Sequence, residues 1–407
     1  MISFPRLNPP FVMNNVCGRT KADSSSPKAV YPILPIEVIN NVCQRLHICD
    51  LANLVRANSI LNVVGTRQLY HTIGVEMHPV RLLQCMISLD RSADLPLLVR
   101  TFEVNLVNNL PTRTYYLLLE RILKKMVSLT TLVVELPKHH SPTWALPMPP
   151  LSTASSKSSS RIFRLHSFTT SMHCKSSLAR FLDSQPEITE LTLRGINSDL
   201  YNLTTLSPLA AFLVPQPSQF ILLPTSLPKL SHFNAVHAGP TVIRNIISSR
   251  PVTHMSIPIL PSQTMDTLSA LSSSSKPLMK LTVMSFDPTA LQYLFPELSK
   301  RFMELESLNI VALMAEVTAT MLLQWGVYLV GFKKMKYITF MAALEGDSNG
   351  GETKEKIDEK KIAQVWHSSC PTLQTVILPH GKVWFEATST DDEKSNWKCQ
   401  KCLNEDE

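Results

Sequence analysis

The chain has 407 residues, of which 44% are hydrophobic and 17% are charged. This composition supplies enough apolar side chains for a large core, and the length predicts roughly two or three domains. Only 11 residues are glycine, a share well below the usual value of about 7%, which argues against folds that hold phosphate groups with glycine-rich loops. The formal net charge of +7 is not gathered into a basic run, which argues against a dedicated nucleic-acid-binding protein.

Residues 1–29 are rich in proline and serine, and we predict that they are disordered. They lack the apolar stretch of a secretory signal. The eight cysteines are scattered through mostly apolar surroundings, a pattern that favours buried free thiols in a reducing compartment over a disulfide framework. We therefore expect an intracellular protein, in the cytoplasm, the nucleus or both.

Residues 30–73 are predicted to form a small unit of three helices. Pro35 stands in the first turn of the first helix, with Glu37 near the positive end of its dipole. Asp50 and Ser59 are predicted to cap the second and third helices. The apolar side chains at helical spacing are Val38, Ile39, Val42, Cys43 and Leu46, then Leu51, Leu54 and Val55, then Leu61, Val64, Leu69, Tyr70 and Ile73. A unit of about 40 residues is at the limit of independent folding, so it must pack against the rest of the chain or a partner.

From about residue 78 to residue 386 one strand motif, L-x-x-L-x-L, recurs. Its copies are 99–104, 129–134, 165–170, 188–193, 230–233, 252–257, 278–283, 305–310, 335–340 and 373–378. Between them, residues 177–184, 241–248 and 289–302 carry one-sided apolar stripes at helical spacing. One strand and one helix per unit predict a curved parallel sheet inside and helices outside, with one continuous core.

The predicted fold class is therefore α/β: a small three-helix unit followed by an irregular solenoid that spans residues 74–386. The middle residues of the strand motifs are roughly 22 to 42 positions apart, against about 20 to 29 in regular leucine-rich repeats. Insertions are expected near 137–161, 197–229 and 345–361. A generic α/β domain is the alternative, and recurrence of the strand motif favours the repeats.

Residues 307–332 carry a single charge, Glu316, and were weighed as a membrane span. Because Glu316 and several polar residues interrupt the run, we expect a short strand and a buried helix, with no membrane partner.

The polar tail, residues 387–407, contains a C-x-x-C pair, Cys399 and Cys402. A structural zinc site needs four ligands, usually from two such pairs, and no second pair is present. A solvated acidic tail is therefore favoured over a metal or redox site, and we expect no metal and no cofactor. No common catalytic motif occurs, so we expect no enzymatic activity.

The inner face of the predicted sheet is the expected binding surface, because repeat proteins bind there. Its side chains alternate with the core residues and become more apolar toward the C-terminal half. Met284, Val311, Tyr337 and Met341 are the predicted target-binding residues, since a cluster of exposed apolar side chains indicates an interaction surface. The alternative is that Trp384 and Phe385 fold back and cover them.

Residues 30–73 resemble an F-box. The resemblance rests on Leu34-Pro35-x-Glu37-Val38-Ile39, Val42, Leu46, Asp50-Leu51, Leu54 and Leu69-Tyr70-x-x-Ile73. Together with the strand motifs that follow, it is similar to fungal F-box proteins with degenerate leucine-rich repeats. The run Arg56-Ala57-Asn58-Ser59-Ile60 departs from the usual family pattern.

This resemblance implies a non-catalytic substrate receptor of a Skp–cullin–F-box ubiquitin ligase. The F-box would bind a Skp-type adaptor, and through it cullin, while the repeats would bind a protein target. The implied adaptor-binding residues are Leu34, Pro35, Ile36, Glu37, Val38, Ile39, Leu51 and Leu54. The alternative is a leucine-rich-repeat scaffold in which the helical unit only caps the solenoid.

Overall fold

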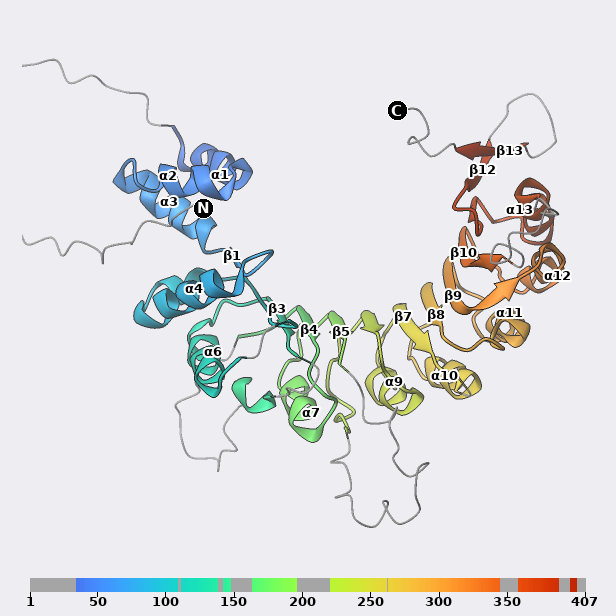
Figure 1. Ribbon diagram of the computed structural model, residues 1–407, viewed down its shortest axis with the longest axis horizontal. Helices are drawn as coiled ribbons and strands as arrows, with labels where there is room; N and C mark the ends of the chain where they lie inside the picture. Colours follow the sequence, from blue (N-terminus) through green and yellow to red (C-terminus); the bar gives the residue numbers. More distant parts are fainter. Residues whose placement is uncertain are drawn as a thin grey trace, which may run out of the picture.

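The computed structural model describes residues 34–108, 111–137, 142–147, 163–195, 220–261, 263–344, 358–387 and 396–400. In these residues the chain forms an open arc, with strands along its inner curve and helices along its outer curve (Figure 1). A three-helix bundle lies at the N-terminal end of the arc. The predicted α/β arrangement, a long and mostly parallel sheet with outer helices, is confirmed.

The described strands form one sheet of 13 strands whose spatial order follows the sequence. Strands β1 to β11 are parallel, and β12 and β13 add to the last edge in antiparallel pairing. The parallel strands are β1 Thr72–Ile73, β2 Thr101–Asn105, β3 Thr131–Glu135, β4 Ser167–Thr170, β5 Glu190–Leu193, β6 His232–Ala235, β7 His254–Ile259, β8 Lys280–Ser285, β9 Ser307–Val317, β10 Tyr337–Leu344 and β11 Thr375–Ile377. The antiparallel strands are β12 Val383–Ala387 and β13 Asn396–Gln400.

Helices fill the crossovers between these strands. The bundle consists of α1 Ile36–Arg45, α2 Ile48–Leu54 and α3 Ser59–Leu69. The outer curve carries α4 Pro79–Arg91, α5 Leu95–Leu98, α6 Arg113–Lys125, the 3-10 turn η1 Thr143–Ala145, α7 Ser176–Asp183, α9 Pro240–Ile247, α10 Thr264–Leu271, α11 Leu291–Arg301, α12 Ala319–Leu329 and α13 Glu359–Ser369.

The middle residues of the predicted strand motifs form one continuous buried row. In register from β1 to β11 this row is Ile73, Phe102, Leu132, Phe168, Leu191, Phe233, Met255, Leu281, Leu308, Ile338 and Val376. Each of these side chains is at most 4% exposed. The row belongs to a single core that extends from Tyr70 to Trp397, so each strand depends on its neighbours for burial, as expected for a solenoid.

A repeated backbone contact holds the strands at their N-terminal edge. The N–H groups of Thr130 and Thr131 both donate to the carbonyl oxygen of Arg100, at 2.9 and 3.0 Å. At the start of each later parallel strand, two successive N–H groups likewise donate to one carbonyl oxygen at the start of the preceding strand. The last pair is Gln374 and Thr375, which donate to Lys336. This contact recurs although the side chains differ, so the backbone repeats more regularly than the sequence does.

The predicted helices 177–184, 241–248 and 289–302 are confirmed within two residues as α7, α9 and α11. Other outer helices, among them α6, α10 and α13, were not predicted from the sequence. In α10 the buried positions include Thr264 and Thr267 beside Leu268 and Leu271, so its inward stripe is half polar and the apolar period is weak. Residues 307–332 form a strand and a helix, β9 and α12, as expected, but β9 has 11 residues and is not the short strand that we predicted. None of the described helices is long and apolar enough to cross a membrane.

Several expected loop regions contain packed residues. Within the insertion expected at 137–161, Ala145 and Leu146 are buried in the main core. Within the insertion expected at 197–229, Phe220, Leu222 and Leu227 are buried in the main core. Within the tail expected at 387–407, Trp397 is 1% exposed and its strand β13 pairs with β12. Residues 1–29 lie outside the described residues. Most of each of the three expected insertions lies outside them as well.

Candidate functional site

The N-terminal bundle has a very small core of its own. Cys43, Leu51 and Val64 form its buried cluster, and Val55 is buried as well. Asn58 begins α3, where its Oδ1 accepts from the N–H of Leu61 at 2.8 Å, so the cap lies one residue before the predicted Ser59. His47, rather than Asp50, occupies the capping position of α2. So few buried residues cannot stabilise an isolated unit of this size, and the bundle depends on further contacts.

One such contact joins the bundle to the sheet. Leu69, the last residue of α3, packs against both the bundle core and the main core. Tyr70 and Ile73 are buried in the main core, and Ile73 pairs with Phe102 in the first pair of strands. Gly74 follows at a φ of 103°, where a Cβ atom would lie 1.8 Å from the carbonyl oxygen of Glu103. The bundle is therefore anchored at the first strand.

The outer surface of the bundle is unusually apolar. Its exposed large apolar side chains are Leu34, Ile36, Val38, Val42, Ile48, Ile60 and Val63. Val38 and Val42 are one turn apart on α1, and Ile60 and Val63 are one turn apart on α3. Val63 is 70% exposed and Leu34 is 57% exposed. So many exposed apolar side chains on one small unit indicate an interaction site.

The predicted adaptor-binding residues divide into two groups. Leu34, Pro35, Ile36, Glu37 and Val38 are exposed. Leu51 is 5% exposed and fills the bundle core, and Ile39 and Leu54 pack partly against that core. Leu51 is therefore a core residue beneath the exposed surface of the bundle. Ile60 and Val63, which were not among the predicted binding residues, are exposed on that surface. The i, i+3 spacing of Ile60 and Val63 in the predicted third helix was the sequence signal that could have identified them.

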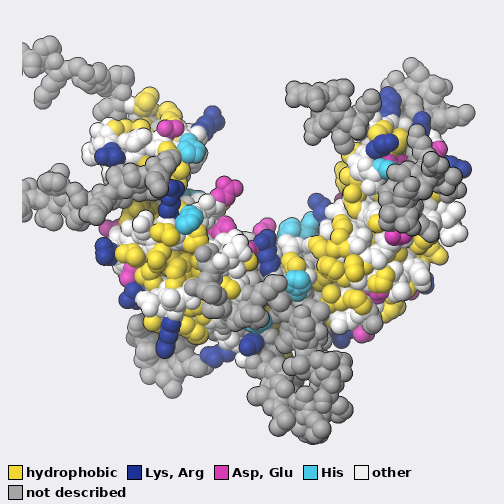
Figure 2. Space-filling model, viewed as in Figure 1, with side chains coloured by type: hydrophobic (Ala, Val, Ile, Leu, Met, Phe, Trp, Pro, Cys, Tyr) yellow, Lys and Arg dark blue, Asp and Glu magenta, His cyan; other side chains and the backbone are white. Residues whose placement is uncertain are grey.

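The inner face of the sheet has the side-chain alternation that the sequence predicts. From β3 to β11, alternate residues of each strand are half-buried or exposed on this face and the residues between them are buried, except at Pro258, which is buried, at Ala342, which is half-buried, and beyond Leu313 in β9. Figure 2 shows acidic side chains on the inner curve near the bundle and histidine side chains near its middle. The chemistry of this surface therefore changes along the arc.

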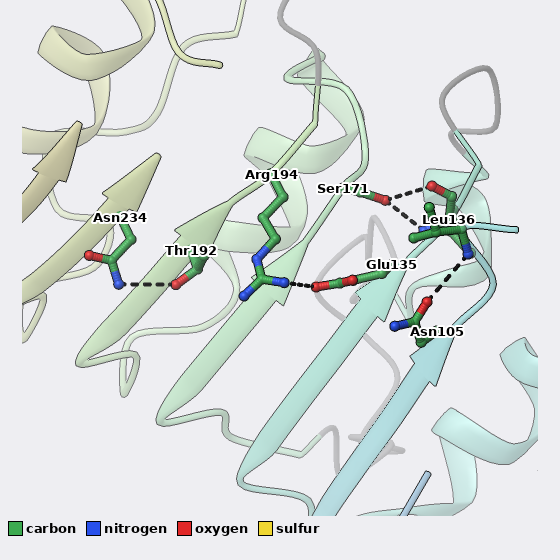
Figure 3. Close-up of polar contacts among 8 residues, drawn as sticks. Asn105, Glu135, Leu136, Ser171, Thr192, Arg194 and Asn234 are labelled. Carbon is green, nitrogen blue, oxygen red and sulfur yellow. Dashed lines mark hydrogen bonds and ion pairs between the residues drawn. The ribbon is translucent and has the colours of Figure 1, made fainter. Parts of the chain in front are cut away.

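On strands β3 to β6 the inner face is polar and its groups bind one another (Figure 3). The guanidinium of Arg194 donates to the carboxylate of Glu135, reaching across β4. Asn234 Nδ2 donates to Thr192 Oγ1 at 3.3 Å. Ser171 Oγ accepts from the N–H of Leu136 at 2.6 Å and donates to its carbonyl oxygen at 3.1 Å. These groups are largely satisfied within the chain.

In the middle of the arc, His232, His254 and Lys280 form a row on neighbouring strands, here called the histidine–lysine cluster. The two imidazole rings stack with centroids 4.2 Å apart. Each Nδ1 lies 2.9 Å from the hydroxyl oxygen of the preceding residue, Ser231 or Thr253. Burial, then the nearby His232 and Lys280, lower the pKa of His254, and Glu306 opposes this shift.

Toward the C-terminal end the inner face becomes apolar. Met284, Val311 and Met341 stand side by side in register on β8, β9 and β10. Tyr337, four residues before Met341 on β10, is 47% exposed. The structure thus places the four predicted target-binding residues on one face of three adjacent strands, here called the apolar patch.

A bulge in β9 enlarges the apolar patch. Ala342 pairs with Ala312 but Ala343 pairs with Glu316, so residues 313–315 have no partner on β10. Within the bulge, Leu313 is 51% exposed and Met314 is 66% exposed. Sequence reasoning missed both residues. The signal was the run Ser307–Val317, whose 11 residues exceed the length of an ordinary strand.

Trp384 does not cover the apolar patch. It pairs in register with the buried Val376 on β11 and packs against the main core. Its indole Nε1 donates to Glu359 Oε2 at 3.2 Å, and the same carboxylate contacts His380 Nδ1 at 2.9 Å. Phe385 pairs with Thr375 from β12, the strand between β11 and the edge strand β13.

No group of three or more potential metal ligands occurs within the described part of the chain. Cys399 lies on β13, and Cys402 lies outside the described residues. The candidate functional surfaces are thus the bundle surface and the inner face of the sheet. Comparison of the sequence with protein-family models and with curated proteins finds no match.

Proposed function

We propose that this chain is the substrate-recognition subunit of a Skp–cullin–F-box ubiquitin ligase. In this role the N-terminal bundle binds a Skp-type adaptor, which links it to cullin, and the inner face of the sheet binds a protein target. The chain itself makes and breaks no bond. It accelerates transfer of ubiquitin by holding the target close to the conjugating enzyme, inside the cell, in the cytoplasm, the nucleus or both.

The observation that carries the proposal is the exposed apolar surface of the bundle. Leu34, Ile36 and Val38 are 57%, 55% and 42% exposed on a bundle that buries few residues of its own. A cap that served only to close the solenoid would bury its apolar side chains against the first strand and present a polar outer face. The proposal gives this apolar surface a partner, and the F-box resemblance of the same residues supports that choice.

The geometry of the arc also supports the proposal. Leu69, Tyr70 and Ile73 fix the bundle to the first strand, so an adaptor on the bundle would keep a constant position relative to a target on the inner face. A flexible link would hold the target less precisely. The alternative is a leucine-rich-repeat scaffold in which the bundle only caps the sheet, and the anchoring by Leu69 is the observation that favours it.

The test is co-purification of the full chain with a fungal Skp-type adaptor. The wild-type chain is expected to bind at micromolar concentration or tighter. The double variant Leu34→Ala and Pro35→Ala is expected to bind at least about tenfold more weakly, because an apolar contact of this size contributes roughly 1–2 kcal/mol. Circular dichroism should show that the sheet and helices of the variant are unchanged, since both residues are exposed.

A matched control is the double variant Val327→Ala and Val330→Ala. These residues are 73% and 68% exposed in and just after α12, at the opposite end of the arc. This variant should bind the adaptor like the wild type. If the wild-type chain shows no affinity for the adaptor at micromolar concentration, the receptor proposal is wrong and the scaffold alternative gains.

A further inference from the structure

The histidine–lysine cluster places three side-chain nitrogen atoms on one row of the inner face. In the described residues no hydrogen bond or ion pair engages Lys280 Nζ or the Nε2 atom of His232 or His254. Ser231 Oγ also donates to the carbonyl oxygen of Thr189 at 3.2 Å. A protonated His232 can therefore donate from Nδ1 to this hydroxyl while its Nε2–H remains available for a ligand.

The charged groups around the cluster do not neutralise it. Glu190 stands beside His232 on the far side from His254, and no contact joins it to either ring. Glu306 is bonded to Lys336 Nζ at 3.0 Å. Lys280 stands beside His254 in register, and no ion pair of the described residues engages it, so this cation favours an anionic group.

A polar row separates this cluster from Met284, Val311 and Met341 of the apolar patch, whereas Tyr337 lies in the same row as Lys280, two strands farther on. Ser256, Thr282, Asn309 and Thr339 follow one another in register from β7 to β10. Asn309 Nδ2 donates to Thr282 Oγ1 at 3.3 Å, and the remaining hydroxyl and amide groups can bond the backbone of an extended peptide. The three rows together offer an anion site, a backbone site and an apolar site in sequence.

We infer that the inner face binds an extended acidic segment of its target protein. A carboxylate of that segment contacts His232, His254 and Lys280, and an apolar side chain packs on the apolar patch. His254 and Val311 are two strands apart and four positions apart along the strand direction, which gives a separation of about 16 Å. An extended peptide spans that distance with about five residues, so the acidic and apolar side chains should be about five positions apart.

This inference deepens the proposed function, because it names the chemistry of the target, and it is tested without the adaptor. The probes are fluorescein-labelled 12-residue peptides of serine, threonine and glycine. Each carries two adjacent aspartates followed by one leucine at four, five or six positions. Comparison probes replace both aspartates with asparagine, both with lysine, or the leucine with serine. A 12-nucleotide oligothymidine tests whether any polyanion is sufficient.

Fluorescence anisotropy with the full chain should show binding of the aspartate–leucine peptides. The asparagine and serine versions should each bind about tenfold more weakly, as expected when one charge-assisted hydrogen bond or one apolar contact is lost. Binding should strengthen as the pH falls from 8 to 6, because a carboxylate bound beside His254 favours its protonated form and opposes the lowering of its pKa by burial.

Single-residue variants test where on the chain the peptide binds. Lys280→Gln and His254→Gln should each weaken binding of the aspartate–leucine peptide about tenfold and have little effect on the asparagine peptide. Lys276→Gln makes the same charge change at an exposed lysine before β8 and should have no effect. Leu313→Asn should weaken binding, whereas Val327→Asn on the outer curve should not.

The inference is wrong if no aspartate–leucine peptide binds below millimolar concentration, or if the asparagine or lysine peptides bind as tightly. It is also wrong if oligothymidine binds more tightly than the peptides, or if Lys280→Gln binds like the wild type. Failure here with intact adaptor binding would overturn only the target chemistry. Peptide binding without adaptor binding would retain the inner face as a binding site and overturn the ligase proposal.

Discussion

Arg250 is a buried cation that holds part of an insertion against the core. Arg250 follows α9 in the chain, and the residue is only 2% exposed. The guanidinium donates to five carbonyl oxygens, those of Leu223 at 2.9 Å, Ser226 at 2.7 Å, Asn245 at 2.8 Å, Ile246 at 2.9 Å and Ser248 at 3.2 Å. Burial lowers the pKa of Arg250, and Asp183 opposes this shift. Arg250 thus joins the unpaired carbonyl end of α9 to residues 220–230.

We predict that Arg250→Ala lowers the free energy of unfolding of this region by about 4 kcal/mol. Each buried carbonyl left without a donor costs about 1–3 kcal/mol. The sum for five is reduced because water reaches some of the vacated acceptors, and removing one partner from a buried charged network typically costs about 3–5 kcal/mol. Arg250→Lys keeps the charge near the helix end but has only three donors, so we expect a loss of about 2 kcal/mol.

Hydrogen exchange measured by mass spectrometry on peptides that cover residues 220–250 tests this prediction, because repeat proteins open locally. The urea midpoint, followed by tryptophan fluorescence, gives the global effect. Arg244→Ala is the matched control, since Arg244 is an exposed arginine on the same helix. The reasoning is refuted if Arg250→Ala loses less than about 1 kcal/mol, or if Arg250→Lys is as stable as the wild type.

Two further predictions concern single positions. Although burial raises the pKa of Asp287, hydrogen bonds from Thr289, Thr264 and Tyr293 lower it overall, below its ordinary 3.8. Its contribution to stability is therefore complete above about pH 4 and is lost as the pH falls through the lowered value. The urea midpoint of Asp287→Asn should lie below the wild type at pH 7 and approach it below pH 3; a gap that does not narrow would contradict this. Tyr337→Asp should cost at most about 1 kcal/mol and Met341→Asp little more, whereas Ile338→Asp, one position along, should unfold the sheet; thermal melts that reverse this order would mean that the assignment of faces is wrong.

The faces of the strands were predictable from the sequence, because they depend on local alternation. Side chains two positions apart point to the same side of a strand, so the motif that contains Leu281 and Val283 assigns Thr282 to the inner face whatever lies next to it. The same reasoning places Met284, Val311, Tyr337 and Met341 on that face. The insertions did not disturb these assignments, since they lie between the strands rather than within them.

The tertiary structure alone decided which side chains became neighbours. His232 and His254 are separated by 21 residues, and only the parallel register of β6 and β7 stacks their rings. In that register the motif residues Phe233 and Met255 pair in the buried row, as the motif residues of the other parallel strands do although the crossovers differ in length. In the same way, the pairing of β9 with β10 creates the bulge that exposes Leu313 and Met314.

The bundle and the C-terminal edge of the sheet show the same division between features that local sequence determines and features that packing determines. Helical periodicity in residues 36–69 determined three helices, but Leu51 and Val38 look alike in sequence and differ in burial because only packing selects the inward side. Trp397 lies in a polar segment whose composition predicts a solvated tail, yet β13 buries it beside His367. Alternation and helical period are local properties that the sequence carries by itself. Contacts between distant segments depend on register and crossover geometry, which only the folded chain fixes.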